Sequence, residues 1–465
     1  MIATKHLTKG DFITMDYSTI KFLGLDHIGI DAQKSFHSYD PTTNNHTIKI
    51  HLIKDDNIHC PTCGCCENIK LRGSKSQIIK YSSTVEDNIN IFLYRRVFKC
   101  ENCGSYFKER NPFTSENRKI SYQKEVKILN ALRDINSTFK RVATHFEVSP
   151  TFVTNLFDKK VSLNRLTLPD VICVDEVYSK KLSFHSYCFI VYSPQMKRII
   201  EVLDSRKLDS LIDFFCKIPI KERDNVKFFS TDLYDTYRVL AKKCFPKAKI
   251  CADPFHVIKN ISDAFHSLRR EIMNYYDYLK HEKNNYYWLL KKYWRLLSLD
   301  PSKLNHKRFK VNKQGQFMSQ HEILEYIFTI DKRLEIAYDL LHEYRNFNQT
   351  ATIDNAEEWL DELIQKFIRS GIKQYEKVWK MLKNWRLEII NSFNKVNGFR
   401  ITNGSMERVN RDVKTMFRLS FGSTNFERMR NRIMFAINKD APILYNRKNK
   451  TNKRKGKLRG PYKQK

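Results

Sequence analysis

The spacing of apolar positions changes several times along the chain and predicts a succession of unlike segments. Aromatic and β-branched residues dominate stretches such as IFLYRRVF before Cys100, which indicates β-strands. Further along, apolar residues recur every three or four positions, as is typical of helices. We expect six segments: a β-rich N-terminal region over 1–112, short helices over 119–165, a strand-rich α/β region over 168–268, a long helical segment over 269–398, further helices over 399–440 and a tail over 446–465.

The α/β region contains five short apolar runs that read as strands. They are VICVD, YCFIVYSPQ, RIIEVLD, VKFFSTD and KAKICAD, and the first three form an apparent antiparallel meander. Helical patterns, KLDSLIDFFCKI and YDTYRVLAKKCF, precede the fourth and the fifth run. This is the order of the ribonuclease H-like fold, in which the first and fourth strands lie side by side. We therefore predict a multidomain α+β protein with a ribonuclease H-like α/β core.

Two of the predicted strands end in an aspartate, Asp175 in the first and Asp232 in the fourth. Paired strands are about 4.8 Å apart, and two carboxylates held that close repel each other unless a cation lies between them. Oxygen ligands suit magnesium or manganese. Glu176 must point to the opposite face, since side chains alternate along a strand. The alternative is that both aspartates are merely solvated at strand ends.

Phosphoryl transfer with two metal ions needs a third carboxylate. The best candidate is Glu407 in ITNGSMERVNRDVKTMFRLSFG, a stretch with one apolar stripe for a helix core face. A second stripe at helical spacing combines the glutamate with three basic residues, Arg411, Lys414 and Arg418. A glutamate near a helix start is often only a favourable partner of the helix dipole. The basic row favours instead a site that faces phosphates.

Composition and charge narrow the class of partner. Of 465 residues, 41% are hydrophobic, which is ample for a core, and 83 lysines and arginines against 51 acids give a net charge of +32. Such an excess suggests a polyanion, most commonly nucleic acid. The tail over 446–465 is strongly basic and is expected to be disordered. Because we find no run of 18 apolar residues and no apolar signal core, we expect a cytosolic protein without a membrane partner.

Six of the eleven cysteines cluster near the N-terminus in a pattern that indicates metal binding. Two C-x-x-C pairs, each followed by glycine, supply four thiolates for a closed, structural zinc site: Cys60, Cys63, Cys100 and Cys103. The 36 residues between the pairs exceed the usual spacing, so a long hairpin must separate them. Cys65 and Cys66 are alternative ligands, and two unrelated cysteine pairs in a β core are the remaining interpretation.

The segment FKRVATHFEVSPTFVTNLF matches a helix, a short turn and a second helix. Ser149 is expected to cap the second helix, with Pro150 in its first turn. That is the geometry of a helix-turn-helix, although such pairs also occur as plain packing units. If the segment binds DNA, the second helix presents four residues to a groove: Thr151, Thr154, Asn155 and Lys159.

Taken together, these motifs resemble a DDE transposase of the ISL-three insertion-sequence family. The likeness covers about residues 15–440 and includes the zinc knuckles, the helix-turn-helix, VDEVY and STDLYDTY. Its most specific parts are DPFHV and TNGSMERVN. The resemblance implies a bacterial or mobile-element enzyme, in the cytoplasm at the nucleoid, that binds the terminal inverted repeats of its element. It also implies cleavage of DNA and joining of the freed 3′ hydroxyls to target DNA with divalent metal.

Carried over to this chain, the family's catalytic triad falls on Asp175, Asp232 and Glu407, with two magnesium or manganese ions. The 175 positions from Asp232 to Glu407 are then explained by a helical insertion over 269–398. Asp253 and His256 resemble a C/D-x-x-H motif of transposases with such an insertion, and an accessory role is one interpretation. A packed histidine is the other. Because two element ends must be paired, the family also implies a homodimer on DNA.

Two other functions compete with this one. A DNA-binding regulator with zinc ribbon and helix-turn-helix could carry an inactive ribonuclease H-like domain, although the three acids argue against it. A structure-selective nuclease such as a resolvase would share the core and the metals, but not the zinc ribbon with helix-turn-helix. The joining of a 3′ hydroxyl to a second duplex separates a transposase from such a nuclease.

Overall fold

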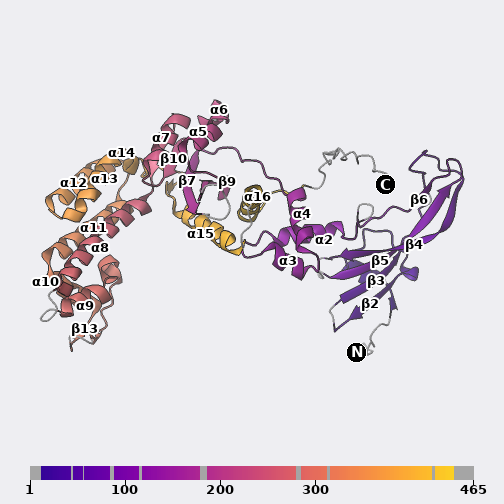
Figure 1. Ribbon diagram of the computed structural model, residues 1–465, viewed down its shortest axis with the longest axis horizontal. Coiled ribbons are helices and arrows are strands. Elements are labelled where there is room, and N and C mark those ends of the chain that lie inside the picture. Colours follow the sequence, from indigo (N-terminus) through magenta and orange to yellow (C-terminus); the bar gives the residue numbers. More distant parts are fainter. Residues whose placement is uncertain are drawn as a thin grey trace, which may run out of the picture. The chain divides into compact units, whose positions relative to one another are not determined.

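The computed structural model describes residues 12–42, 45–55, 57–83, 88–114, 118–178, 186–278, 284–311, 315–420 and 425–444 (Figure 1). The chain divides into two compact units, Met1–Leu163 with Lys439–Lys465, and Asn164–Asn438. The basic tail predicted over 446–465 lies outside the described residues. No helix in the described ranges is long and apolar enough to cross a membrane. The fold is mixed α+β, as expected.

The first unit is built on a six-stranded sheet in the order β1-β2-β3-β5-β4, with β6 paired to β5. Alternate residues of β5 are buried, which is the expected pattern of a sheet with one covered face. The short helix α1 (Tyr17–Phe22) lies near the start of the unit. The strands are β1 (Ile13–Thr14), β2 (Phe36–Asp40), β3 (Asn45–His51), β4 (Ile69–Tyr81), β5 (Ile89–Cys100) and β6 (Tyr106–Lys108).

Three short helices follow this sheet: α2 (Tyr122–Ala131), α3 (Phe139–His145) and α4 (Pro150–Lys160). Each begins at a serine or threonine whose side chain accepts a hydrogen bond from the first turn. The predicted start of α4 is confirmed, since Ser149 caps it and Pro150 is its first residue. Glu147, with φ 52°, makes the tight turn between α3 and α4.

The second unit contains a five-stranded sheet in the order β11-β10-β7-β8-β9. Its strands β7, β8 and β9 are antiparallel, and β10 and β11 run parallel to β7. The predicted side-by-side position of the first and fourth strands is therefore confirmed. The strands are β7 (Val171–Tyr178), β8 (Tyr187–Ser193), β9 (Arg198–Leu203), β10 (Phe228–Thr231) and β11 (Lys249–Ala252).

Helices cover both faces of this sheet. On one face, α5 (Leu208–Cys216) and α7 (Asp235–Cys244) share a core with Ile172 and Val174 of β7, and α6 (Ile220–Arg223) lies between them in the chain. Side chains of β7 that alternate with these point to the other face. There, α15 (Gly404–Leu419) packs against β7, and α16 (Phe426–Ile437) packs against β9.

A helical insertion with its own core separates β11 from α15. It begins with α8 directly after Asp253 and ends at Asn403, whose backbone N–H donates to the carboxylate of Asp253 at 3.3 Å. Both ends of the insertion are thus held at one edge of the sheet. Its helices are α8 (Pro254–Tyr278), α9 (Asn284–Lys292), α10 (Gln320–Ile330), α11 (Lys332–Thr350), α12 (Ala356–Arg369), α13 (Glu376–Asn384) and α14 (Arg386–Asn391). Two short hairpins complete it: β12 (Phe309–Lys310) with β13 (Phe317–Met318), and β14 (Lys395–Val396) with β15 (Phe399–Arg400).

Candidate active site

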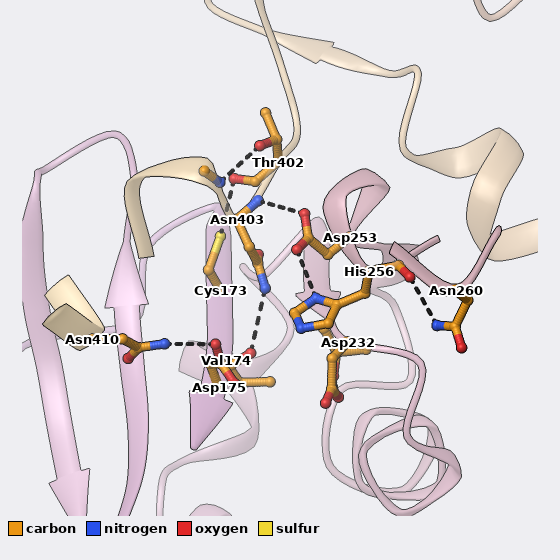
Figure 2. Close-up of polar contacts among 12 residues, drawn as sticks. Cys173, Val174, Asp175, Asp232, Asp253, His256, Asn260, Thr402, Asn403 and Asn410 are labelled. Carbon is orange, nitrogen blue, oxygen red and sulfur yellow. Dashed lines mark hydrogen bonds and ion pairs between the residues drawn. The ribbon is translucent and has the colours of Figure 1, made fainter. Parts of the chain in front are cut away.

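The expectation that the first strand ends at Asp175 is wrong, because β7 continues to Tyr178 in its pairing with β8. Asp232 directly follows the last residue of β10, the parallel neighbour of β7. Ser230 of β10 is in register with Cys173 of β7. Two positions further along each strand, Asp232 therefore stands opposite Asp175, and both side chains point to the sheet face that α15 covers. Figure 2 shows Asp175 on its strand and Asp232 next to the imidazole of His256. The convergence that the sequence predicts for this pair follows directly from the register.

The carboxylate of Asp175 is held by two donors. The backbone N–H of Glu176 donates to Oδ1 at 2.7 Å, and the side-chain amide of Asn410 donates to Oδ2 at 2.6 Å (Figure 2). Sequence reasoning did not single out Asn410. The available signal was its place three residues after Glu407, because residues at that spacing lie on one side of a helix.

Glu176 points away from this site, as predicted. It lies on the face of α7, where the hydroxyl of Tyr237 donates to its Oε2 at 2.5 Å and Arg206 forms an ion pair with it. The guanidinium of Arg206 also stacks on the ring of Tyr187, with 3.8 Å to the ring centroid. Glu176 thus helps to hold β7 in place from the face opposite Asp175.

Glu407 lies on the side of α15 that faces β7. The side chain of Asn403 donates to the carbonyl of Val174 at 3.5 Å, and Asn410 bonds to Asp175. Glu407 is four residues after one of these asparagines and three before the other, so all three share one helix face. Its Oε1 is buried and has no hydrogen-bond partner among the described residues. A buried carboxylate oxygen without a hydrogen-bond donor is suited to binding a cation.

Asp253, which is buried, and His256, which is half-buried, form a pair beside the two aspartates. Asp253 is 1% exposed, and its Oδ2 accepts a hydrogen bond from Nδ1 of His256 at 2.9 Å. Figure 2 shows the imidazole between Asp253 and Asp232. Burial lowers the pKa of His256, but the bond to Asp253 and the charges of Asp175 and Asp232 outweigh it, so the net pKa is raised. The histidine therefore lies at the site rather than in an apolar core.

The carboxylates of this cluster are costly to ionise together. Burial and then the charge of Asp175 raise the pKa of Asp232 from 3.8 to about 6. Burial likewise raises the pKa of Asp175, against the hydrogen bonds from Glu176 and Asn410. Like charges in a site of low polarity repel each other, and a cation between them removes that cost. The carboxylate oxygens of Asp175 and Asp232 are ligands of the kind that magnesium and manganese prefer. Among the described residues, however, the four-cysteine cluster is the only group of three or more side chains placed closely enough to hold a metal ion.

The three basic residues predicted to face phosphates, Arg411, Lys414 and Arg418, lie on α15 outside its buried face. None of them forms an ion pair with an acid in the described part of the chain, and Arg418 donates to the hydroxyl of Thr415 at 3.1 Å. Their charges are therefore available to an anionic ligand.

The four cysteines of the predicted zinc site converge in the first unit, with sulfur atoms all within 4.8 Å of one another. Cys60 and Cys103 are 3.6 Å apart, and Cys63 and Cys100 are 3.7 Å apart. Zinc–sulfur bonds of about 2.3 Å in a tetrahedron require separations of about 3.8 Å, so the cluster fits a structural zinc ion.

Neighbouring residues support this interpretation of the knuckles. Gly64 and Gly104, both with φ 73°, adopt the left-handed conformation that each knuckle needs. The thiol of Cys65 donates instead to the carbonyl of Glu67 at 3.0 Å, outside the cluster. Cys66 is exposed and is not part of the cluster either.

The predicted DNA-binding residues of α4 lie on its outer side. Thr151 and Asn155 are exposed and Thr154 and Lys159 are half-buried, whereas Val153, Leu156 and Phe157 are buried. The hydroxyl of Thr154 donates to the carbonyl of Pro150 at 3.0 Å. This helix thus offers a polar face to a ligand.

Comparison with known families agrees with the geometry of the second unit. The family model DDE_Tnp_ISL3, described as a transposase, matches residues 172–433, which is more than half of the chain. The protein belongs to this transposase family. No curated protein sequence matches the chain.

The zinc site can be tested with a pair of cysteine variants. We expect Cys100→Ser to lose bound zinc, because a tetrahedral site cannot keep a structural ion with one thiolate missing. Cys66→Ser is the matched control and is expected to keep the metal. Zinc content measured by atomic absorption on the two purified proteins checks this. Equal zinc in both variants contradicts the assignment.

The raised pKa of Asp232 makes a prediction for protein that lacks magnesium and manganese but keeps its zinc. Between pH 3.8 and about 6 the unfolded chain has released the proton that the folded protein still holds. Rising pH therefore lowers stability through this window, and the full stability is present only below it. Asp232→Asn should remove this slope and be more stable than the parent by about 1–3 kcal/mol at pH 7.5.

Urea unfolding of the second unit from pH 4 to pH 7.5 measures the effect. The control is Asp170→Asn, since Asp170 precedes β7 at the surface and pairs with Lys227 at 2.8 Å. Identical pH curves for Asp232→Asn and the parent would count against mutual repulsion in the site.

Proposed function

We propose that this protein is a DDE-type transposase that binds the terminal inverted repeats of an insertion sequence, cleaves the DNA strands and joins them to target DNA. The observation that carries the proposal is that Asp232 stands opposite Asp175 at neighbouring parallel strands, while Asn410 of α15, the helix that carries Glu407, bonds to Asp175. The strand order supports a ribonuclease H-like core. Membership in the transposase family supports DNA as the substrate.

The proposed chemistry assigns a role to each acid. Asp175 and Asp232 would hold one magnesium or manganese ion, and Asp175 and Glu407 a second. When bound, such a pair activates the attacking water or 3′ hydroxyl and stabilises the leaving oxygen. Asp175 contributes to both positions, so its orientation matters most. His256, held by Asp253, lies close enough to adjust the charge of the site.

Binding of the element ends is assigned to the first unit. The four-cysteine cluster would act as a structural zinc ribbon, and α3 with α4 as a helix-turn-helix whose second helix enters a groove. Arg411, Lys414 and Arg418 would contact phosphates of the strand at the active site. Since two ends must be joined, we propose a homodimer in the DNA complex.

The alternative is a DNA-binding regulator with an inactive core. What disfavours it is the repulsion between the buried carboxylates: a protein without need for a cation gains nothing from keeping them close. Metal-dependent nicking of element-end DNA separates the two functions.

Catalysis can be tested by a conservative change of the central acid. We expect Asp175→Asn to retain binding to element-end DNA and to lose strand cleavage by roughly 100-fold or more, because the change removes the charge shared by both metal positions. Cleavage of labelled end fragments with manganese measures it, and Asp170→Asn serves as the control. Cleavage at the parental rate in Asp175→Asn refutes the proposed mechanism.

Recognition by α4 can be tested separately. Asn155→Ala should weaken binding to the element ends by about 1–3 kcal/mol through loss of a base contact. It should leave binding to unrelated duplex DNA nearly unchanged. Asn130→Ala, an exposed asparagine on α2, is the control. Equal losses on both kinds of DNA would indicate that this helix does not read sequence.

A further inference from the structure

Asn410 is a buried polar residue to which the proposed reaction gives no role. It is 8% exposed, and its side-chain amide reaches across from α15 to Oδ2 of Asp175 on β7 at 2.6 Å (Figure 2). Such a short bond to a carboxylate is charge-assisted. It joins two elements that are separated by 235 positions in the chain.

The other end of this amide is unsatisfied. Oδ1 of Asn410 is buried without a hydrogen-bond partner among the described residues, and the same holds for Oε1 of Glu407 one turn earlier. A buried acceptor left without a donor has lost its hydrogen bonds to water without replacement, which destabilises the fold. Two such oxygens lie on one helix face, beside two aspartates. They indicate a binding site for a cation, or for a water molecule bound to that cation.

An asparagine suits this position chemically. Its amide donates to Asp175 without adding a charge, whereas an aspartate would add a further anion to a crowded group of carboxylates. Because Asn410 and Glu407 share one helix face, the bond to Asp175 also sets how closely Glu407 approaches that acid. This hydrogen bond, together with the one from the backbone N–H of Glu176, therefore orients the carboxylate of Asp175, and it helps to hold the turn of α15 that carries Glu407.

We propose that Asn410 is a positioning residue of the metal site, which holds Asp175 in its ligating orientation and fixes the spacing between Asp175 and Glu407. The inference rests on the proposed function, because it takes these acids to be the metal ligands. Residues that orient metal ligands typically contribute about 10–100-fold to metal affinity. If the hydrogen bond between Asn410 and Asp175 served only packing, its loss would lower stability and leave the metal affinity unchanged.

The experiment measures manganese binding to the full-length, zinc-loaded protein by electron paramagnetic resonance of free manganese, together with thermal unfolding in the absence of manganese. We expect Asn410→Ala to weaken manganese binding by about 10–100-fold. The matched control is Asn438→Ala: Asn438 is 4% exposed and bonds to both backbone groups of Ile199 at 2.9 Å, on β9. This variant should unfold at a lower temperature and bind manganese as the parent does.

A second variant keeps the test decisive if Asn410→Ala does not fold. Asn410→Asp places a carboxylate against Asp175, so it should unfold earlier than the parent without manganese and gain more from added manganese. Parental manganese affinity in Asn410→Ala, or a parental manganese-induced shift in Asn410→Asp, overturns the inference.

The same titration on Asp175→Asn and Asp232→Asn separates this failure from failure of the proposed function. If the aspartate variants lose manganese binding while Asn410→Ala keeps it, only the positioning role is wrong. If the aspartate variants also bind as the parent does, the cluster is not the metal centre, and both proposals fall.

Discussion

Parallel pairing of β7 with β10 is the constraint on which the rest of the site depends. The register of that pair brings Asp175 and Asp232 to the same level at the carboxyl edge of the sheet. Side-chain alternation then sends both toward α15 and sends Glu176 toward α7. A shift of this register by one residue would move the side chain of Asp175 to the face that packs against α5 and α7, away from α15. The apolar residues of β7 that share a core with α5 and α7 make such a slip expensive.

Helix α15, which carries Glu407, reaches this edge by a different route. Asn403 returns from the insertion to within hydrogen-bond distance of Asp253, the residue from which the insertion departs, although 150 positions separate the two. The insertion thus leaves the sheet and returns to it at the same edge, and it packs around its own core. Its length therefore does not disturb the sheet. Bonds from Asn403 to Val174 and from Asn410 to Asp175 then hold the first two turns of α15 against β7.

The cluster around Asp175 and Asp232 contains several groups that lower stability. Burial raises the pKa of both aspartates, and acceptor oxygens of Glu407 and Asn410 lack partners in the described part of the chain. Each of these features lowers the free energy of unfolding, whereas packed apolar residues at the same place would not. Sites that retain such costs are commonly functional ones. The four-cysteine cluster of the first unit likewise brings four sulfur atoms within 4.8 Å of one another, an arrangement that fits a structural metal ion.

Local sequence signals were enough to predict the helices and strands of the core and the kinds of residue that would bind metal ions. The order of strands and helices, the cap at Ser149, the glycines after each knuckle and the opposite orientation of Glu176 follow from periodicity and backbone preferences, which act over a few residues. The choice of Cys60 and Cys63 over Cys65, the place of His256 beside the aspartates, and the bonds made by Asn403 and Asn410 depend on contacts between segments far apart in the chain. No periodicity encodes such contacts, because they arise only when the sheet register and the return of the insertion are both in place.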